Sequence, residues 1–188
     1  SWVILFSHPA DFTPVCTSEI LELAYLQDDF ESLKTKLLVI STDNLNSHIE
    51  WVKSMEAMEY KGRKKVKIKF PLISDNTLEI SQKYGMISTS PNSKKDVRGV
   101  FIIDTDDRVR AIFFYPDDVG RNLEEIRRTL IALQETDGNK YLTPANWFPG
   151  QDVMLPSPQT VSEAEKRRAE KNPDLYELDW YVWFKKMK

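Results

Sequence analysis

The stretch FSHPADFTPVCTSE, residues 6–19, decides the fold, because it leads from a predicted strand into a predicted helix. The apolar run at its start, Trp2–Phe6, is consistent with a buried strand. Thr13 is a suitable N-cap and Pro14 a suitable first helical residue, so Cys16 falls in the first helical turn. The free N–H groups and the partial positive charge at this helix end favour a thiolate, the nucleophilic form of cysteine. From the spacing alone, a reactive thiol and an inert buried cysteine are equally acceptable.

Strands and helices alternate downstream of this stretch, which is typical of an α/β domain. We expect helices over residues 15–35, 47–60, 77–84 and 122–134, and strands over residues 37–40, 70–73, 99–104 and 109–115. The last two strands flank an Asp-rich turn, which predicts a hairpin. The β-α-β order followed by β-β-α predicts a thioredoxin-like fold, in which helices flank a mixed sheet.

The composition changes near residue 138, where prolines begin to interrupt the pattern. We therefore expect a thioredoxin-like domain over residues 1–137 and an extended C-terminal arm, a small dimerisation domain, over residues 138–188. The arm carries one predicted helix near residues 160–171 and the aromatic run WYVWF at residues 180–184. A short arm cannot easily bury so many aromatic side chains on itself, so we expect it to pack on the main domain or on a partner subunit. The chain begins inside an apolar run without an initiator methionine, and we expect N-terminal strands of the domain to be missing from it.

The composition argues against several classes of function. The 188 residues carry a formal net charge of −3, which gives no reason to expect nucleic acid or an anionic membrane as a partner. No apolar run approaches the roughly 18 residues that a membrane-spanning helix needs, and we expect a cytoplasmic protein. The chain has one cysteine and two histidines, so an intramolecular disulfide cannot form within it, and we expect no metal site.

A known family is indicated by the spacing of Pro9, Thr13 and Cys16, which matches the P-x-x-x-T-x-x-C signature of peroxiredoxins. The longer stretch 6–19 resembles their single-cysteine (1-Cys) subfamily, and the tail resembles archaeal-like members of the thioredoxin peroxidase type. The resemblance continues in order through residues 97–102, 115–116, 120–122, 143–147 and 153–156. It implies a thiol-dependent peroxidase that needs no cofactor. Such an enzyme reduces hydrogen peroxide and alkyl hydroperoxides through a cysteine sulfenic acid.

The resemblance assigns roles to four positions. Cys16 would be the peroxidatic nucleophile, and the Thr13 hydroxyl would hold the peroxide and the thiolate. Pro9 would shield the site from water. Arg98 would stabilise the thiolate and the charge on the peroxide oxygens, and its planar fork of donors suits a substrate with two oxygens.

Three further residues would support the site. Glu19 and Arg121 match a glutamate and a second arginine that form a hydrogen-bonded network in the family, although a pair on the surface would contribute under about 1 kcal/mol. His8 matches a histidine that lies close to the reactive sulfur in similar proteins. The alternative for His8 is a loop histidine satisfied by the backbone.

The tail departs from archaeal-like relatives, which carry C-x-D-W-x-x-C near the end. Glu177 and Trp183 stand where the two cysteines would be, so the chain has no resolving thiol. The sulfenic acid at Cys16 must therefore be reduced by an external thiol.

Two other functions remain open at this point. The first is a redox-sensing, oligomeric holdase chaperone, which the aromatic arm and the missing resolving cysteines favour. The second is an interaction module of thioredoxin fold with an inert Cys16. For the peroxidase we expect a homodimer, which could assemble further into a ring of dimers.

Overall fold

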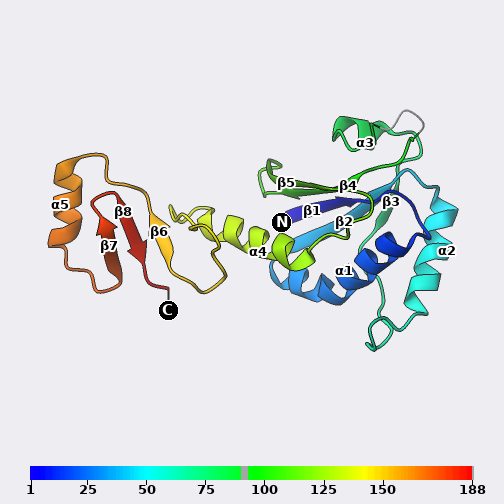
Figure 1. Cartoon of the computed structure of the whole chain (residues 1–188), viewed down its shortest axis with the longest axis horizontal. Coiled ribbons are helices and arrows are strands. Elements are labelled where there is room, and N and C mark those ends of the chain that lie inside the picture. The colour runs from blue at the N-terminus through cyan, green and yellow to red at the C-terminus, as the bar shows by residue number, and fades with distance from the viewer. Residues whose placement is uncertain (90–92, 188) are drawn as a thin grey trace. The chain divides into compact units, whose positions relative to one another are not determined.

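The computed structural model describes residues 1–89 and 93–187 (Figure 1). The chain forms two compact units, Ser1–Leu123 and Glu124–Lys188. The boundary that the sequence suggests, after residue 137, keeps helix α4, Leu123–Thr136, with the residues before it. That boundary remains a prediction.

The first unit is built on a five-stranded sheet. Its strands lie in the order β3 (Leu72–Ser74), β2 (Thr35–Ser41), β1 (Trp2–Ser7), β4 (Arg98–Ile103) and β5 (Val109–Tyr115). Strand β1 runs parallel to β2 and antiparallel to β4, so the sheet is mixed. Strands β4 and β5 form the predicted hairpin. The thioredoxin-like fold expected from the element order is confirmed.

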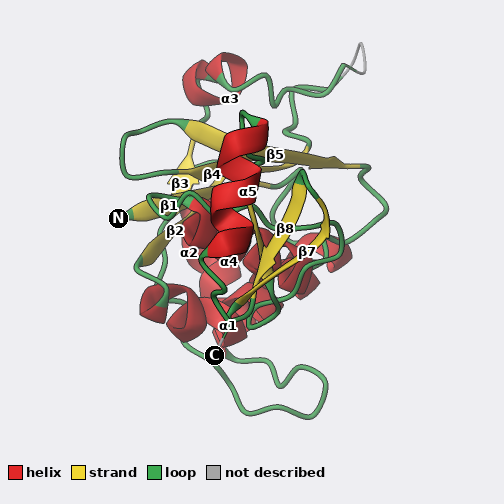
Figure 2. Ribbon diagram, turned by 90° about the vertical axis from the view of Figure 1, so that its left-hand side faces the viewer, coloured by secondary structure: helices red, strands yellow, loops and turns green. Residues whose placement is uncertain are grey.

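Helices cover both faces of this sheet. The helices of the unit are α1 (Pro14–Ser32), α2 (Leu45–Glu56) and α3 (Glu79–Lys83), and α1 and α3 lie on opposite sides of the sheet in Figures 1 and 2. Central strand β1 is therefore buried on both faces, and Ile4, Leu5 and Phe6 are each at most 4% exposed. This double burial explains why β1 is an unbroken apolar run rather than an alternating one.

The second unit contains a small antiparallel sheet that the sequence analysis did not predict. Its strands are β6 (Val153–Leu155), β7 (Leu175–Asp179) and β8 (Val182–Lys185), in the order β6-β8-β7. The helix expected near residues 160–171 is confirmed as α5, Val161–Ala169. These strands are short, and prolines interrupt the sequence around them. The alternation of apolar and polar residues by which a strand is recognised therefore cannot be seen in the sequence.

The aromatic side chains of the arm divide into two groups. Trp183 is buried within this unit, with the Arg167 guanidinium 5.3 Å from its ring centre. Trp180 and Tyr181 are each 49% exposed. The arm therefore buries part of its aromatic run on itself and leaves part of it open.

Within the described ranges, no helix is both long and apolar enough to cross a membrane.

Candidate active site

Cys16 lies in the first turn of α1, directly behind the loop that leaves β1. Its side chain is fully buried. Because β4 pairs with β1, the first residue of β4 is brought to the same end of the sheet as this loop. That residue is Arg98, and its Nη1 donates to Cys16 Sγ over 3.2 Å. The guanidinium therefore faces the sulfur, where it stabilises a negative charge.

Arg98 is held by two further acceptors. Its Nη1 also donates to Glu19 Oε2 over 3.0 Å. Its Nε and Nη2 donate to the backbone carbonyl of Asp117, over 2.9 and 2.6 Å. A guanidinium has five N–H groups, and these bonds use four of them. Among the described residues, the remaining Nη2–H has no hydrogen-bond acceptor.

Glu19 joins Arg98 to Arg121 in a buried network. Its Oε1 accepts from Arg121 N and Nε over 2.7 and 2.9 Å, and its Oε2 accepts from Arg121 Nη2 over 2.7 Å. Arg121 Nη1 donates to the carbonyls of Ser7 and Gly99, each over 2.8 Å. Burial alone would raise the pKa of Glu19, but Arg121 and Arg98 hold that pKa below its usual value. The site therefore carries one carboxylate between two guanidinium groups, and these three side chains together leave one net positive charge beside Cys16 Sγ.

Thr13 occupies the predicted N-cap position, with φ −108° and ψ 149°. Its hydroxyl does not cap the helix, because Oγ1 donates to the carbonyl of Ala10 over 2.8 Å. The proton of the hydroxyl is thus committed to the loop, and the oxygen lone pairs are available as acceptors. Pro9 is buried in the same loop.

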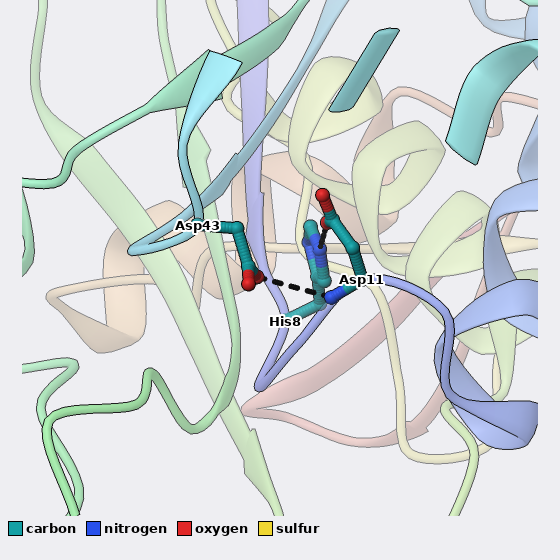
Figure 3. Close-up of side chains that lie close together, drawn as sticks. All are labelled: His8, Asp11 and Asp43. Carbon is teal, nitrogen blue, oxygen red and sulfur yellow. Dashed lines mark hydrogen bonds and ion pairs between the residues drawn. The ribbon is translucent and has the colours of Figure 1, made fainter. Parts of the chain in front are cut away.

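His8 is not satisfied by the backbone, which was one of the two interpretations considered for it. Its Nε2 lies 2.9 Å from Asp11 Oδ1, and the other carboxylate oxygen of Asp11 lies 2.7 Å from His48 Nδ1. His8, Asp11 and Asp43 together offer donor atoms that could surround a cation (Figure 3). However, Asp11 Oδ1 already faces His8, and Asp43 Oδ2 accepts from the backbone N–H of Asp11 over 3.0 Å. The group is therefore a hydrogen-bonded network, in which Asp11 Oδ1 and Asp43 Oδ2 already have partners.

Asp11, Asp43 and His48 were not predicted from the sequence as site residues. Asp11 lies inside the quoted stretch 6–19, but its partner His48 is 37 residues away. One signal was available, because the two histidines of the chain are the two ends of this network. The structure also brings together Cys16 and Arg98, which sequence spacing could not connect.

The positions of the absent resolving cysteines face each other in the second unit. Glu177 on β7 is paired with Trp183 on β8. Glu177 binds the Arg168 Nε over 2.7 Å, and Trp183 lies under Arg167. The chain thus places an ion pair and a cation–aromatic contact at the positions where the resemblance would place two thiols.

Known proteins are similar to this chain over most of its length. The model of the AhpC/TSA family matches residues 1–112, and the model of the C-terminal domain of 1-Cys peroxiredoxin matches residues 132–171. A peroxiredoxin of Methanosarcina mazei is 45% identical over 186 residues, which cover 98% of this chain and 85% of that protein. The chain belongs to the peroxiredoxin family.

Solved structures of this family show the same fold. A cysteine-to-serine mutant of peroxiredoxin 6 from Arenicola marina superimposes with a TM-score of 0.85 at 33% identity, covering 100% of this chain and 86% of that one. A yeast mitochondrial 1-Cys peroxiredoxin superimposes with a TM-score of 0.83 at 37% identity, covering 99% of this chain and 86% of that one. The structure of the yeast protein concerns its thiol-resolving mechanism, which runs through the glutathione and thioredoxin systems.

Family membership makes the chain a thiol-dependent peroxidase. Its single cysteine fits the 1-Cys mechanism, in which an external thiol resolves the oxidised enzyme. Peroxiredoxins use peroxide substrates and thiol reductants. The comparisons give no support to the holdase chaperone considered above, and they contradict an interaction module with an inert cysteine.

Proposed function

We propose that Cys16 is the nucleophile of this peroxidase, and that hydrogen peroxide and alkyl hydroperoxides are its substrates. The observation that carries the proposal is the 3.2 Å contact between Arg98 Nη1 and Cys16 Sγ at the N-terminus of α1. The thiolate attacks one peroxide oxygen and the O–O bond breaks. Cys16 becomes a sulfenic acid, and the other oxygen leaves with a proton as water or an alcohol.

Two residues complete the substrate site in this proposal. The unused Nη2–H of Arg98 donates to a peroxide oxygen, where negative charge grows as the O–O bond breaks. The Thr13 oxygen accepts the hydrogen bond of the hydroperoxide O–H, because its own proton is committed to Ala10. Pro9 fills the wall of the loop and keeps water from the sulfur. Glu19 and Arg121 keep the Arg98 fork in place.

Reduction of the sulfenic acid needs two equivalents of an external thiol. The first thiol forms a mixed disulfide with Cys16 and releases water, and the second releases the Cys16 thiol and leaves as a disulfide. We propose a thiol of the glutathione or thioredoxin class, in line with the yeast relative. We also propose the cytoplasm as the location, because a reducing compartment supplies such thiols and keeps an unpaired cysteine reduced.

The assembly we propose is a homodimer, with a ring of dimers as its larger form. Support comes from apolar side chains left open on edge strand β5, where Ile112 and Phe114 are 52% and 55% exposed. Trp180 and Tyr181 add open aromatic surface in the arm. Truncation after Leu142 should shift the sedimentation of the protein toward a monomer. A truncated chain that forms the same oligomer as the full-length chain would contradict a role of the arm in assembly.

The experiment that tests the proposed function is steady-state peroxide consumption with glutathione or a thioredoxin system as reductant. The Cys16→Ser variant should show no consumption above background. Ser32→Ala, at the exposed C-terminal end of the same helix, is the matched control and should keep the wild-type rate. Peroxide consumption by Cys16→Ser would mean that another group performs the chemistry.

A further inference from the structure

The loop between β1 and Cys16 is fixed by residues from elements outside it. Asp11, in the middle of the loop, faces His8 through one carboxylate oxygen and His48 of α2 through the other. Its backbone N–H donates to Asp43, which precedes α2 (Figure 3). The next residue, Phe12, has φ 55°, a left-handed conformation that costs a non-glycine residue about 1–3 kcal/mol. External anchors are needed to hold a loop with such strain in one conformation.

The acceptors around His48 fix its protonation state. Its Nε2 lies 3.2 Å from the carbonyl oxygen of Ile73, which can only accept, so Nε2 carries a proton. Its Nδ1 lies 2.7 Å from Asp11 Oδ2. Burial opposes ionisation of Asp11, but hydrogen bonds from His48 and His8 hold its pKa well below the usual range, so Asp11 is a carboxylate. Both ring nitrogens of His48 therefore donate, and the ring is an imidazolium.

The same reasoning fixes the state of His8. Asp11 Oδ1 is a carboxylate oxygen, so the His8 Nε2 that faces it carries a proton. His8 Nδ1 is buried, and among the described residues no group hydrogen-bonds to it. Burial lowers the pKa of His8, with Arg121 and His48 adding to the effect against the pull of Asp11. His8 is therefore neutral, with a proton on Nε2 and a free lone pair on Nδ1.

His8 belongs to the surroundings of the reactive cysteine. Its ring centre lies 5.0 Å from that of Trp51 on α2, and Trp51 Nε1 donates to the hydroxyl of Thr17, the neighbour of Cys16. Arg121 acts on His8 through its charge, and it shares Glu19 with Arg98, which donates to Cys16 Sγ. His8 is therefore linked to neighbours of Cys16 through Trp51 and through Arg121.

We propose that His48 is a positioning residue of this peroxidase, which acts as an imidazolium through Asp11. It keeps His8 in the neutral Nε2–H tautomer. It also holds in place the loop between β1 and Cys16, which contains Thr13. The hydrogen bond that one ring nitrogen of a histidine makes decides which of its two nitrogens carries the proton. For His8, this bond is the one from Nε2 to Asp11, which His48 holds in place from the other side of the carboxylate. The proposal rests on the geometry of the His8 and His48 rings around the Asp11 carboxylate. It adds His48 to the site of the proposed function, and only the kinetic test of the proposal depends on that function.

The proposal predicts an alkaline limit for the reaction. Among the described residues, the charged or titratable groups that face His48 are Asp11 from the loop before α1, Asp43 from the loop before α2, and His8. Burial would lower the pKa of His48, but Asp11 and then the carbonyl of Ile73 raise it above its ordinary value of 6.5. A raised pKa means that the charged, ordered state is complete below pH 6.5 and is lost as pH rises through the higher folded value. The rate of Cys16 oxidation should therefore fall on the alkaline side.

Nitrogen NMR on protein labelled only at histidine tests the protonation states directly, because the chain has two histidines. At neutral pH, one ring should give the spectrum of an imidazolium and the other that of a neutral Nε2–H tautomer. The spectrum of His48→Asn assigns the two rings. Two neutral rings, or a His8 with its proton on Nδ1, would overturn the proposal even if the protein reduces peroxide normally. A wild-type protein without peroxidase activity would instead refute the proposed function and leave the NMR result standing.

The kinetics of two His48 variants distinguish a positioning role of His48 in catalysis from a role in the stability of the fold alone. His48→Asn keeps a donor near the place of Nδ1, and His48→Gln keeps one near the place of Nε2, but neither carries charge. Both should oxidise Cys16 on the order of 10-fold more slowly at neutral pH and should lack the alkaline fall, since misplacing a reacting group by about 1 Å costs up to about 100-fold. Glu50→Gln, on the exposed face of α2, is the control and should match wild type. If both His48 variants keep the wild-type pH profile, or if neither folds while the wild-type profile has no alkaline fall, the proposal is wrong.

Discussion

Arg98→Ala removes the N–H group that donates to Cys16 Sγ at 3.2 Å. A hydrogen bond to a charged group contributes about 1.5–3 kcal/mol. Because about 1.4 kcal/mol corresponds to a tenfold change in rate, losing this bond should slow the oxidation of Cys16 by roughly 10- to 150-fold. Glu19 would keep its three bonds to Arg121, so the fold around the site should persist.

Arg98→Lys should recover part of the loss. An ammonium carries the charge, but it lacks the planar fork whose three nitrogens reach Sγ, Glu19 and the Asp117 carbonyl. The assay is the second-order rate constant of Cys16 oxidation, followed by stopped-flow tryptophan fluorescence at several peroxide concentrations. Arg108→Ala is the matched control, because the Arg108 side chain is 75% exposed and its ion pair with Asp106, which is 69% exposed, is long at 3.8 Å. Wild-type rates in Arg98→Ala would refute the assigned role of this guanidinium.

Three further predictions concern the buried carboxylate of Glu19 and the oxidation of Cys16. Glu19→Gln should lower the free energy of unfolding in urea by about 3–5 kcal/mol, because the new amide N–H₂ would face two Arg N–H groups in a buried site; a loss below about 1 kcal/mol would contradict this. Since the folded pKa of Glu19 lies below 4.5, its contribution should be present above pH 4.5 and disappear as pH falls through the folded value, and urea titrations of Glu19→Gln should lack that part of the pH dependence. Mass spectrometry under excess peroxide without reductant should show two and then three oxygens added to Cys16, and a chain that stops at one oxygen must protect its sulfenic acid by other contacts.

Much of the first unit could be predicted from local patterns. The apolar run of β1, the proline at the start of α1 and the hairpin turn are all encoded by neighbouring residues, and each element lies where it was expected. The position of Cys16 in the first helical turn follows from the same local signals. The role of Thr13 needed the structure, because its hydroxyl could equally have capped the helix.

Contacts between distant residues could not be predicted from patterns. Arg98 and Cys16 are 82 residues apart, and Glu19 and Arg121 are 102 apart, so only the family resemblance suggested that they meet. The resemblance did not supply His48, since no spacing rule links a helix residue to a loop on another element. The small sheet of the second unit was missed for a different reason, because strands as short as Val153–Leu155 carry too little pattern.

The most direct test of the account is a single-turnover experiment on the reduced protein. One equivalent of hydrogen peroxide is mixed with the wild-type chain, and the protein thiol is counted before and after treatment with excess glutathione, which is removed before the second count. The account predicts that one thiol per chain, Cys16, is lost and that sulfenic acid forms, and that the thiol returns when glutathione is added. If the thiol count does not change while peroxide disappears, or if neither glutathione nor a thioredoxin system restores it, Cys16 is not the nucleophile of an externally resolved peroxidase.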